Sequence, residues 1–277
     1  MAIQHNLNPD ILHLGPITIR WYGMMYVVGF IIGYYVLKSE SKRKNLPYTE
    51  EDISDFIFYL MLGVILGGRI GYIIFYNLAY YMANPIKIIA ITEGGMSFHG
   101  GLIGIILATI LYARKKKAKF SDLGDMVALG GALGLGFGRI GNFINGELYG
   151  RPVSPDFPLA FIFPADPLKL PRHPSQIYES LTEGFIMFAV LYFLSRKNVK
   201  SGTLSGTFLM LYGTFRFFIE FTREPDVQIG LFLNMFSMGQ ILCLPMIIVG
   251  LAIIIISNFS KNKKEELKLA EEKGSNE

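Results

Sequence analysis

An all-α polytopic membrane protein is the fold class that the sequence predicts. Hydrophobic residues make up 51% of its 277 residues, charged residues only 17%, and the mean hydropathy is +0.39. Because a soluble domain carries about 25% charged residues, this chain has too few to cover a water-facing surface. Several apolar stretches are also long enough to cross about 30 Å of hydrocarbon as helices.

Composition excludes several other classes of protein. Thirty glycines without a triplet repeat exclude collagen, and the high apolar content excludes a disordered chain. The single cysteine, Cys243, excludes an intramolecular disulfide and a cysteine zinc site, and inside an apolar span it is expected to be an inert, packed thiol. The four histidines have no metal-ligand spacing, so we expect no metal site and no cofactor.

Seven segments are predicted to cross the membrane. Residues 1–20 lack the basic start and apolar core of a cleavable signal peptide, so the first apolar segment is expected to be a true span. The fourth segment is rich in glycine and has the weakest hydropathy signal. The predicted spans are residues 21–38, 53–76, 97–113, 123–142, 176–195, 204–222 and 236–258.

Positive charge predicts the orientation of these spans. Of the 26 basic residues, 17 follow spans one, three and five or lie in the tail, six lie on the other side and three lie inside spans. The positive-inside rule therefore places the N-terminus outside and the C-terminus in the cytoplasm. The basic run at 114–119 fits this topology and contact with anionic membrane lipids, and does not indicate a nucleic-acid site.

An extracytoplasmic cap is predicted at residues 143–175, as an insertion in a seven-span transmembrane domain over residues 1–260. Seven prolines in the cap segment exclude a long helix there. Residues 261–277 mix lysine with glutamate and are expected to form a charged cytoplasmic tail.

Three arginines lie inside predicted spans: Arg69, Arg139 and Arg216. A charged side chain near the bilayer centre costs at least about 2.5–3.5 kcal/mol, so each is a hypothesis for function. All three fall near the outer ends of their spans, and we expect them to cluster at one depth beside the cap. The carboxylates expected to pair with them are Glu147, Glu179 and Glu220.

Arg216, Glu220 and Arg223 are spaced to share one face of a helix. One carboxylate between two guanidiniums would leave a net positive charge and free donors, which suits a phosphate because a guanidinium fork matches its oxygens. The alternative is an ion-pair stitch between helices, and the spacing does not separate the two interpretations.

Arg139 lies in a second polar run, with Asn142, Asn145 and Glu147 among glycines. Amide side chains can hydrogen-bond ester or glycerol oxygens, and close helix packing does not require three strongly polar groups. Two glycine series with four-residue spacing, Gly63-Gly67-Gly71 and Gly130-Gly134-Gly138, are instead expected to serve helix packing.

His99 is the histidine expected to be functional. Glycines flank it at the outer entry to span three, which leaves the ring accessible, and its ordinary pKa near 6.5 suits a proton acceptor. The alternative is a satisfied core histidine. His5 and His13 are expected at the surface, and His173 either in a loop or at the membrane surface.

Two tyrosines, Tyr22 and Tyr212, can reach inward from spans one and six. Together these residues predict an arginine-rich polar chamber at the outer leaflet that binds an anionic amphiphile, most simply a phospholipid. No nucleophile of the protein's own is evident, so in an enzyme both reacting groups would come from substrates.

The sequence resembles one family, the bacterial prolipoprotein diacylglyceryl transferases. The resemblance covers spans one to seven in order, and its longest block is specific. Its blocks are IRWYGMMY (19–26), LGGRIGYIIFYN (66–77), GGMSFHGGLIG (94–104), GRIGNFINGELYGR (138–151), RHPSQIYE (172–179), YGTFRFFIEFTREPD (212–226) and SMGQIL (237–242).

This resemblance implies a reaction and a location. The family moves the diacylglyceryl group of phosphatidylglycerol onto the cysteine thiol in the lipobox of a prolipoprotein signal peptide. A thioether forms and glycerol phosphate leaves, which is the first step of bacterial lipoprotein maturation. The implied location is the bacterial cell (inner) membrane, and the implied partners are these two substrates and the membrane lipids.

The resemblance also assigns residues. Arg139 matches a phosphatidylglycerol-binding arginine, while Arg216 and His99 match positions essential for activity. Other matching positions, important for function or lipid binding, are Tyr22, Asn142, Glu147, Gly150, Tyr212, Glu220 and Arg223. From these we hypothesise that Arg139 and Arg223 hold the phosphate and that Arg216 stabilises the departing glycerol phosphate. His99 would assist deprotonation of the thiol.

Two alternatives come from other classes of protein. A carrier or flippase for an anionic lipid is disfavoured by the odd number of spans and the absence of a repeat, since many carriers are built from repeated halves. A membrane scaffold would not require arginines inside spans at one depth. Product formation separates the enzyme from both.

Overall fold

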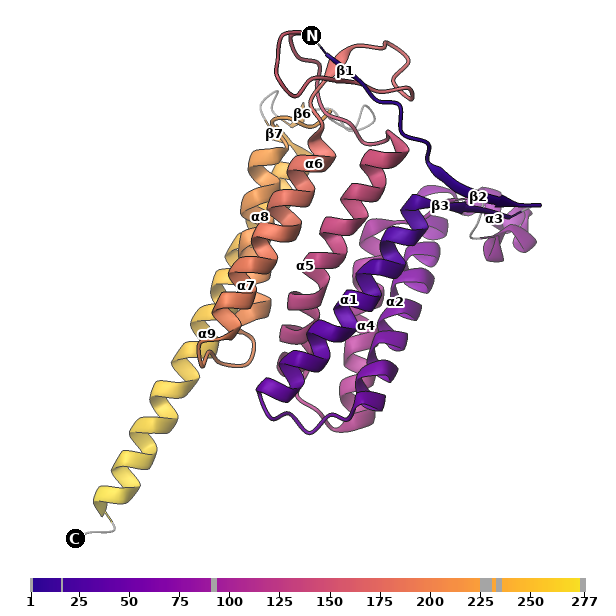
Figure 1. Ribbon diagram of the computed structural model, residues 1–277. Coiled ribbons are helices and arrows are strands. Elements are labelled where there is room, and N and C mark those ends of the chain that lie inside the picture. The colour runs from indigo at the N-terminus through magenta and orange to yellow at the C-terminus, as the bar shows by residue number, and fades with distance from the viewer. Residues whose placement is uncertain (1, 16, 91–93, 225–230, 233–235, 275–277) are drawn as a thin grey trace. The chain divides into compact units, whose positions relative to one another are not determined.

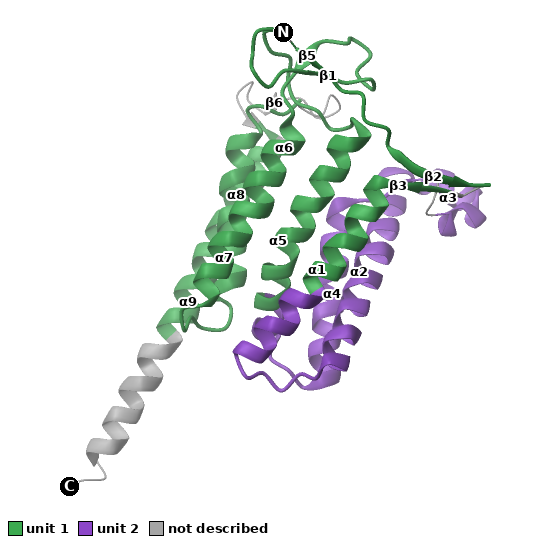
Figure 2. Cartoon of the chain, viewed as in Figure 1, with its two compact units in different colours: residues 1–33, 125–277 green, residues 34–124 purple. Residues whose placement is uncertain are grey.

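The computed structural model describes residues 2–15, 17–90, 94–224, 231–232 and 236–274, with the backbone alone at residues 17, 231, 232, 236 and 238 and from residue 260 onward. Pro225 and Asp226, the last two residues of one motif block, lie outside the described residues, as do residues 275–277 of the predicted tail. The chain divides into two compact units, residues 1–33 with 125–277 and residues 34–124 (Figure 2). Helices α1 (Trp21–Arg43) and α5 (Phe120–Asn145) each run from one unit into the other.

The unit of residues 34–124 is built on a close pair of long helices, α2 (Glu50–Tyr76) and α4 (Phe98–Lys116), joined through α3 (Leu78–Ala83) and the 3₁₀ helix η1 (Pro85–Ile89) (Figure 1). A Cβ added to Gly63 would lie 2.6 Å from the Gly104 carbonyl oxygen, and one added to Gly71 would lie 2.7 Å from Gly100 Cα. Only glycine lets the two backbones approach this closely. The predicted packing role of the Gly63-Gly67-Gly71 series is confirmed.

The other unit holds α5, a helical segment of three parts, α8 (Thr203–Ile219) and α9 (Met238–Gly274) (Figure 1). The three-part segment runs through α6 (Ser175–Glu179), the π-helix η3 (Ser180–Ile186) and α7 (Met187–Ser195). Glycines again set the closest approaches, Gly136 to Gly184 between α5 and η3 and Gly206 to Gly250 between α8 and α9. In the Gly130-Gly134-Gly138 series, a Cβ on Gly134 or Gly138 would meet nothing within 4 Å, but a Cβ on Gly29 of α1 would lie 3.3 Å from Gly134 Cα. The predicted packing role is therefore supported at Gly134 and not at Gly138.

Asp125 fastens the start of α8 to α5. Its fully buried carboxylate accepts hydrogen bonds from the Gly202 N–H at 2.9 Å, the Ser205 N–H at 2.8 Å and the Ser205 hydroxyl at 2.9 Å. The first N–H groups of a helix have no partner within the helix, and a carboxylate there also complements the helix dipole. This contact holds the helix that carries Arg216.

The Pro-rich segment folds on a small sheet whose strand order is β1-β4-β5. The strands are β1 (Ile3–Gln4), β4 (Phe161–Ile162) and β5 (Pro171–Arg172), with β1 parallel and β5 antiparallel to β4. The expectation of a surface position for His5 is wrong. Its ring is 3% exposed, lies against Phe143 and Phe163, and has Nε2 2.7 Å from the Phe143 carbonyl oxygen.

The remaining strands form two hairpins, β2 (Asp10–Leu14) with β3 (Ile17–Arg20) and β6 (Leu231–Phe232) with β7 (Phe236–Ser237). These short strands are the departure from the all-α expectation. His13, on β2, is exposed as expected.

The chain is mostly helical, and each of the seven predicted spans overlaps a helix or helical segment. Four of these are long and apolar enough to cross a membrane, namely Glu50–Tyr76, Phe120–Asn145, Ser175–Ser195 and Gly239–Phe259. The predicted C-terminal boundary of the span 204–222 lies too far along the chain, because α8 stops at Ile219. Cys243 is buried in α9, as expected.

Candidate functional site

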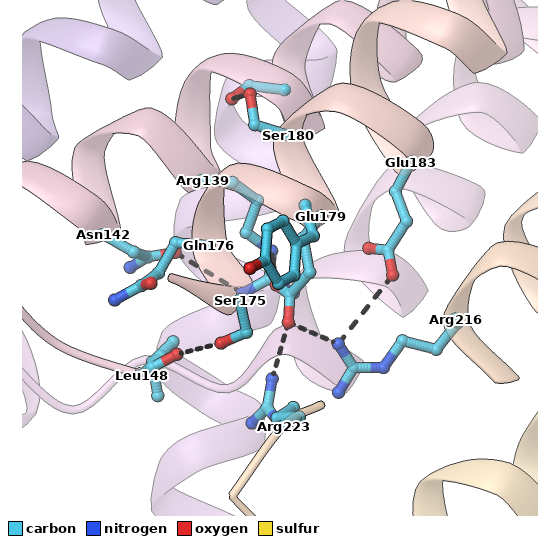
Figure 3. Close-up of polar contacts among 12 residues, drawn as sticks. Arg139, Asn142, Leu148, Ser175, Gln176, Glu179, Ser180, Glu183, Arg216 and Arg223 are labelled. Atoms are coloured by element: carbon cyan, nitrogen blue, oxygen red, sulfur yellow. Dashed lines mark hydrogen bonds and ion pairs between the residues drawn. The ribbon is translucent and has the colours of Figure 1, made fainter. Parts of the chain in front are cut away.

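A buried carboxylate, Glu179, gathers three arginines (Figure 3). Its Oε1 accepts hydrogen bonds from Arg216 Nη1 at 2.9 Å and from Arg223 Nη1 at 3.5 Å. Its Oε2 lies 2.6 Å from Arg139 Nε, an ion pair whose angles are poor for a hydrogen bond. Arg139 comes from α5, Arg216 from α8 and Arg223 from the turn after α8, so one side chain joins three parts of the same unit.

Local contacts fix the helix turn that presents Glu179. At the start of α6, the Ser175 hydroxyl donates to the Leu148 carbonyl at 3.1 Å, and Gln176 Nε2 donates to the Glu147 carbonyl at 2.6 Å. One residue after Glu179, the Ser180 hydroxyl donates to the Gly136 carbonyl at 2.9 Å. All three anchoring side chains are buried. The position of the carboxylate is therefore set from both sides.

The π-helix η3 follows immediately and contributes a second buried carboxylate, Glu183. Its Oε1 lies 3.9 Å from Arg216 Nη1, and both its carboxylate oxygens lack a hydrogen-bond partner among the described residues. π-helical turns are rare and occur frequently at functional sites. Figure 3 shows Glu183 and Glu179 on the same side of Arg216.

A third carboxylate, Glu220, completes the set around Arg216. Its Oε2 lies 3.0 Å from Arg216 Nη2, and its Oε1 accepts a hydrogen bond from the Ser237 hydroxyl at 3.0 Å. Ser237 also caps α9, because its hydroxyl accepts from the Gln240 N–H at 3.2 Å while Gln240 Oε1 accepts from the Ser237 N–H at 3.0 Å. The start of α9 thus supports the arginine.

The cluster holds as many acidic side chains as guanidiniums, whereas the spacing of residues 216–223 alone predicted one carboxylate between two guanidiniums. Three guanidiniums meet three carboxylates, those of Glu179, Glu183 and Glu220. Each guanidinium has five N–H donors, and its contacts with the described residues use only some of them. The side chains of Arg139, Arg216 and Arg223 remain 15%, 14% and 13% exposed. Donors are thus left to bind an anion that enters the site.

Arg223 does not continue the face of α8, as its spacing predicted, because the helix ends at Ile219. Its guanidinium contacts Glu179, while its backbone forms a β-bridge with Gly150. A Cβ on Gly150 would lie 2.7 Å from His173 Cβ, so only glycine fits there. The structure therefore gives Gly150 a packing role beneath the segment that presents Arg223.

Arg139 has polar neighbours on its own helix. Its Nη1 donates to Asn142 Oδ1 at 3.4 Å, and Asn142 Nδ2 donates to Glu147 Oε1 at 2.8 Å. Asn145 Nδ2 donates to the same oxygen at 3.3 Å. Glu147 was expected to pair with an arginine, but its contacts among the described residues are with these amides. Of the three predicted carboxylate partners, Glu179 and Glu220 are confirmed.

The two predicted tyrosines lie in the same unit. Tyr22 packs on Gly141, and its hydroxyl lies 3.0 Å from that of Tyr26. Tyr212 is buried on α8, with its ring parallel to that of Phe208 at a centroid distance of 6.1 Å.

Arg69 and His99 belong to the unit of residues 34–124, so clustering at one depth is established only for Arg139 and Arg216. Arg69 is buried and donates to backbone carbonyls in η1 and beyond it, among them those of Ile88 in η1 at 2.8 Å and Gly94 after η1 at 2.6 Å. Carbonyls thus take the place of the expected carboxylate partner, and this arginine holds a loop. His99 is exposed in the first turn of α4, which the Ser97 hydroxyl caps by accepting from the Gly100 N–H at 3.2 Å.

A buried ion pair stabilises the cap. Arg172 donates to Asp166 through Nε at 2.6 Å and through Nη2 at 3.2 Å, and to Glu224 at 2.8 Å. Burial alone would raise the pKa of Asp166. The hydrogen bonds from Arg172 and from the N–H groups of Leu168 and Leu170 outweigh it and hold that pKa below its ordinary value. Burial lowers the pKa of His173, whose Nδ1 lies 3.3 Å from the Tyr178 hydroxyl.

Comparison with known proteins identifies the family. The model of the family described as prolipoprotein diacylglyceryl transferase matches residues 9–256. The chain belongs to this family. It is 49% identical over 251 residues to the phosphatidylglycerol–prolipoprotein diacylglyceryl transferase of Geobacter sulfurreducens, covering 91% of this chain and 95% of the relative. It is 51% identical over 253 residues to the same enzyme of Bordetella avium, with 90% and 94% covered.

The chain is therefore an enzyme, a bacterial multi-pass membrane transferase of lipoprotein maturation. A relative from Pseudoalteromonas translucida with the same description is 47% identical over 262 residues, or 95% of this chain and 97% of the relative. The matched range contains the arginine cluster, the capping carboxylate Asp125 and the whole cap.

Sequence reasoning missed the central position of Glu179 and overlooked Glu183. A signal was available, because two glutamates four residues apart inside the predicted span 176–195 are as costly as the arginines that drew attention. Asp125 and the Asp166–Arg172 pair were also overlooked. Their partners are fixed by the tertiary fold, and no local pattern marks them.

We predict that Asp166→Asn lowers the free energy of unfolding of the cap by about 3 kcal/mol, because breaking a buried ion pair leaves Arg172 with uncompensated charge. A carboxyl whose folded pKa is depressed stabilises the fold above its unfolded pKa, and the contribution is lost as the pH falls through the folded pKa. Protection of the wild-type cap should therefore be complete at neutral pH and decline below about pH 4.

Hydrogen exchange of residues 146–174 in detergent between pH 7 and pH 3 measures this effect. The matched control is Asp156→Asn, which removes an exposed carboxylate from the same cap and should leave exchange unchanged. Equal exchange in the two variants would contradict the conclusion that the ion pair of Asp166 with Arg172 stabilises the cap.

Proposed function

We propose that the chain transfers the diacylglyceryl group of phosphatidylglycerol to the lipobox cysteine of a prolipoprotein signal peptide, at the cluster of Arg139, Arg216 and Arg223. The observation that carries this proposal is the convergence of three guanidiniums on one buried carboxylate. The names of the related enzymes specify phosphatidylglycerol and prolipoprotein.

The reaction requires little from the protein except positioning and electrostatics. The cysteine sulfur attacks the glyceryl carbon that bears the phosphate, the new carbon–sulfur bond forms, and the carbon–oxygen bond breaks with its electron pair on the phosphate. Glycerol phosphate leaves, and the thiol proton passes to a base or to the departing phosphate. No nucleophile of the enzyme is needed, and the negative charge grows on the phosphate oxygens.

Arg139 and Arg223 would hold the phosphate, and Arg216 would stabilise the charge that develops as it leaves. The support is geometric, since each guanidinium is held by Glu179 and still has N–H donors that its contacts with the described residues do not use. Donors already aimed at a developing charge need no reorganisation during the reaction, which makes them effective catalysts. Guanidinium forks also match phosphate oxygens in pairs.

The other predicted residues fit supporting roles around these arginines. Asn142 and Glu147 would orient Arg139, and Glu220 would orient Arg216. Gly150 would let the chain bearing Arg223 approach, and Tyr22 and Tyr212 would line the lipid's path. His99 would assist thiol deprotonation, supported by its exposed ring. A thiol with a pKa near 8.5 is already a few per cent ionised at pH 7, so this assistance is modest.

The charge pattern supports a seven-span topology with the N-terminus and the 143–175 cap outside and the 261–277 tail in the cytoplasm. In this arrangement residues 1–260 form the catalytic domain in the bacterial inner membrane. The lipobox cysteine of a secreted precursor would then meet the enzyme at the outer leaflet.

The proposal predicts that purified protein, given phosphatidylglycerol and a lipobox peptide, releases glycerol phosphate in a cysteine-dependent manner. The peptide should gain the mass of the diacylglyceryl group, and a peptide with alanine in place of the cysteine should release nothing. Equal release with the alanine peptide would indicate lipid hydrolysis. No release from either peptide would favour a carrier for anionic lipids.

His99→Gln tests the proton-transfer role. General base assistance typically contributes 10²–10⁴-fold, but a partly ionised thiol lowers that demand, so we expect turnover to fall about tenfold at pH 6 and to recover toward pH 9 as the thiol ionises. The measurement is the rate of peptide lipidation from pH 6 to pH 9. A variant with wild-type turnover across this range would exclude the role.

A further inference from the structure

A second candidate site for an anionic ligand lies at the end of α4, in the unit of residues 34–124. A cavity of about 430 Å³ is lined there by Ile110, Ala113, Arg114, Lys117, Ala118 and Phe120. The cavity is wide open to its surroundings, which suits a lipid headgroup whose acyl chains remain outside it. Lys117 ends α4 in the left-handed conformation with φ 52°, and the chain then turns into α5 at Phe120. Four lining side chains are apolar and two are cationic.

The basic run around this cavity sorts into paired and unpaired charges. Lys115 lies 3.5 Å from Asp55 Oδ2 and Lys116 pairs with Asp52, both carboxylates on α2. Arg114 and Lys117 are exposed and have no acidic partner among the residues that the structure describes. Lys119 is also exposed and has no acidic partner among the described residues, but it does not line the cavity. Arg114 and Lys117 are therefore the cations placed to bind an external anion at the cavity.

On the N-terminal side of Arg114, α4 has an exposed apolar face that suits contact with a lipid acyl chain. Ile103, Leu107 and Leu111 are 51%, 54% and 56% exposed, and spacings of four, four and three place them in line with Arg114 on one helix face. A free phosphate would use the cations but not this apolar track. A phospholipid would use both, with its headgroup at the cavity and an acyl chain along α4.

We propose that this cavity binds an anionic phospholipid, with the phosphate between Arg114 and Lys117 and an acyl chain along Ile103, Leu107 and Leu111. Basic pockets at the ends of transmembrane helices are known to hold anionic headgroups. The site shares no residue with the arginine cluster around Glu179, so its lipid is a structural ligand and not the diacylglyceryl donor.

Photo-crosslinking tests the proposal on the full chain in phosphatidylcholine nanodiscs. The probe is phosphatidylserine with a photoreactive group near its headgroup, and the readout is its adduct on residues 103–120, located by mass spectrometry. A matching photoreactive phosphatidylcholine reports contact without net charge. Each basic residue near an anionic lipid contributes roughly a factor of five in binding, so Arg114→Gln with Lys117→Gln should raise the half-labelling lipid fraction about 30-fold.

The matched control is Lys115→Gln with Lys116→Gln, which removes the same charge from the same run. It should shift labelling less than about threefold, since its charges are already paired. Each single variant, Arg114→Gln or Lys117→Gln, should shift labelling about fivefold. Excess inorganic phosphate, added before irradiation, should not reduce the yield of the adduct. Equal shifts in the two double variants, equal labelling by phosphatidylcholine, or displacement by phosphate would each overturn the proposal.

Discussion

The buried Glu179 carboxylate is the contact on which the rest of the candidate site depends. Three guanidiniums close together repel one another, and they converge here because one fully buried anion lies among them. The strength of a charge pair rises sharply as water is excluded, while an arginine left buried without its partner is costly. The same interaction that holds the helices together therefore prepares donors for a phosphate. An ion-pair stitch between helices and a phosphate site are alternatives at the level of sequence, but in the structure they are compatible.

The surrounding fold can be understood as the means of presenting this cluster. Gly136 and Gly184 bring α5 against η3, so that Arg139 reaches Glu179 from the neighbouring helix. Asp125 caps α8 and holds the helix of Arg216 from its far end. Gly150 provides room for the segment that carries Arg223. In each case a residue with no charge in the cluster determines where a guanidinium lies.

Sequence patterns predicted the parts of this site that depend on one helix, and failed where several segments meet. Apolar length located the helices, and the spacing of four residues predicted the contact of Arg216 with Glu220. The contact of Arg139 with Glu179 joins residues forty positions apart, which no helical period can reveal. The spacing predicts Arg223 on the face of a helix that in fact ends at Ile219, and span position predicts a carboxylate partner for Arg69, which backbone carbonyls satisfy instead. The burial of His5 could not be predicted, because it depends on β1 pairing with β4, about 158 residues along the chain.

The most direct test of the account compares Glu179→Gln with Glu183→Gln. Both substitutions neutralise a buried carboxylate beside Arg216, but only the first removes the shared partner of all three arginines. The measurement is kcat/KM for glycerol phosphate release by each variant, purified as a monodisperse protein. This value should fall on the order of 100-fold in Glu179→Gln, the usual loss when a preorganised charge-stabilising contact is removed. Glu183→Gln should lose less than about tenfold. Near wild-type release by Glu179→Gln, or an equal loss in both variants, would contradict the claim that Glu179 organises the site.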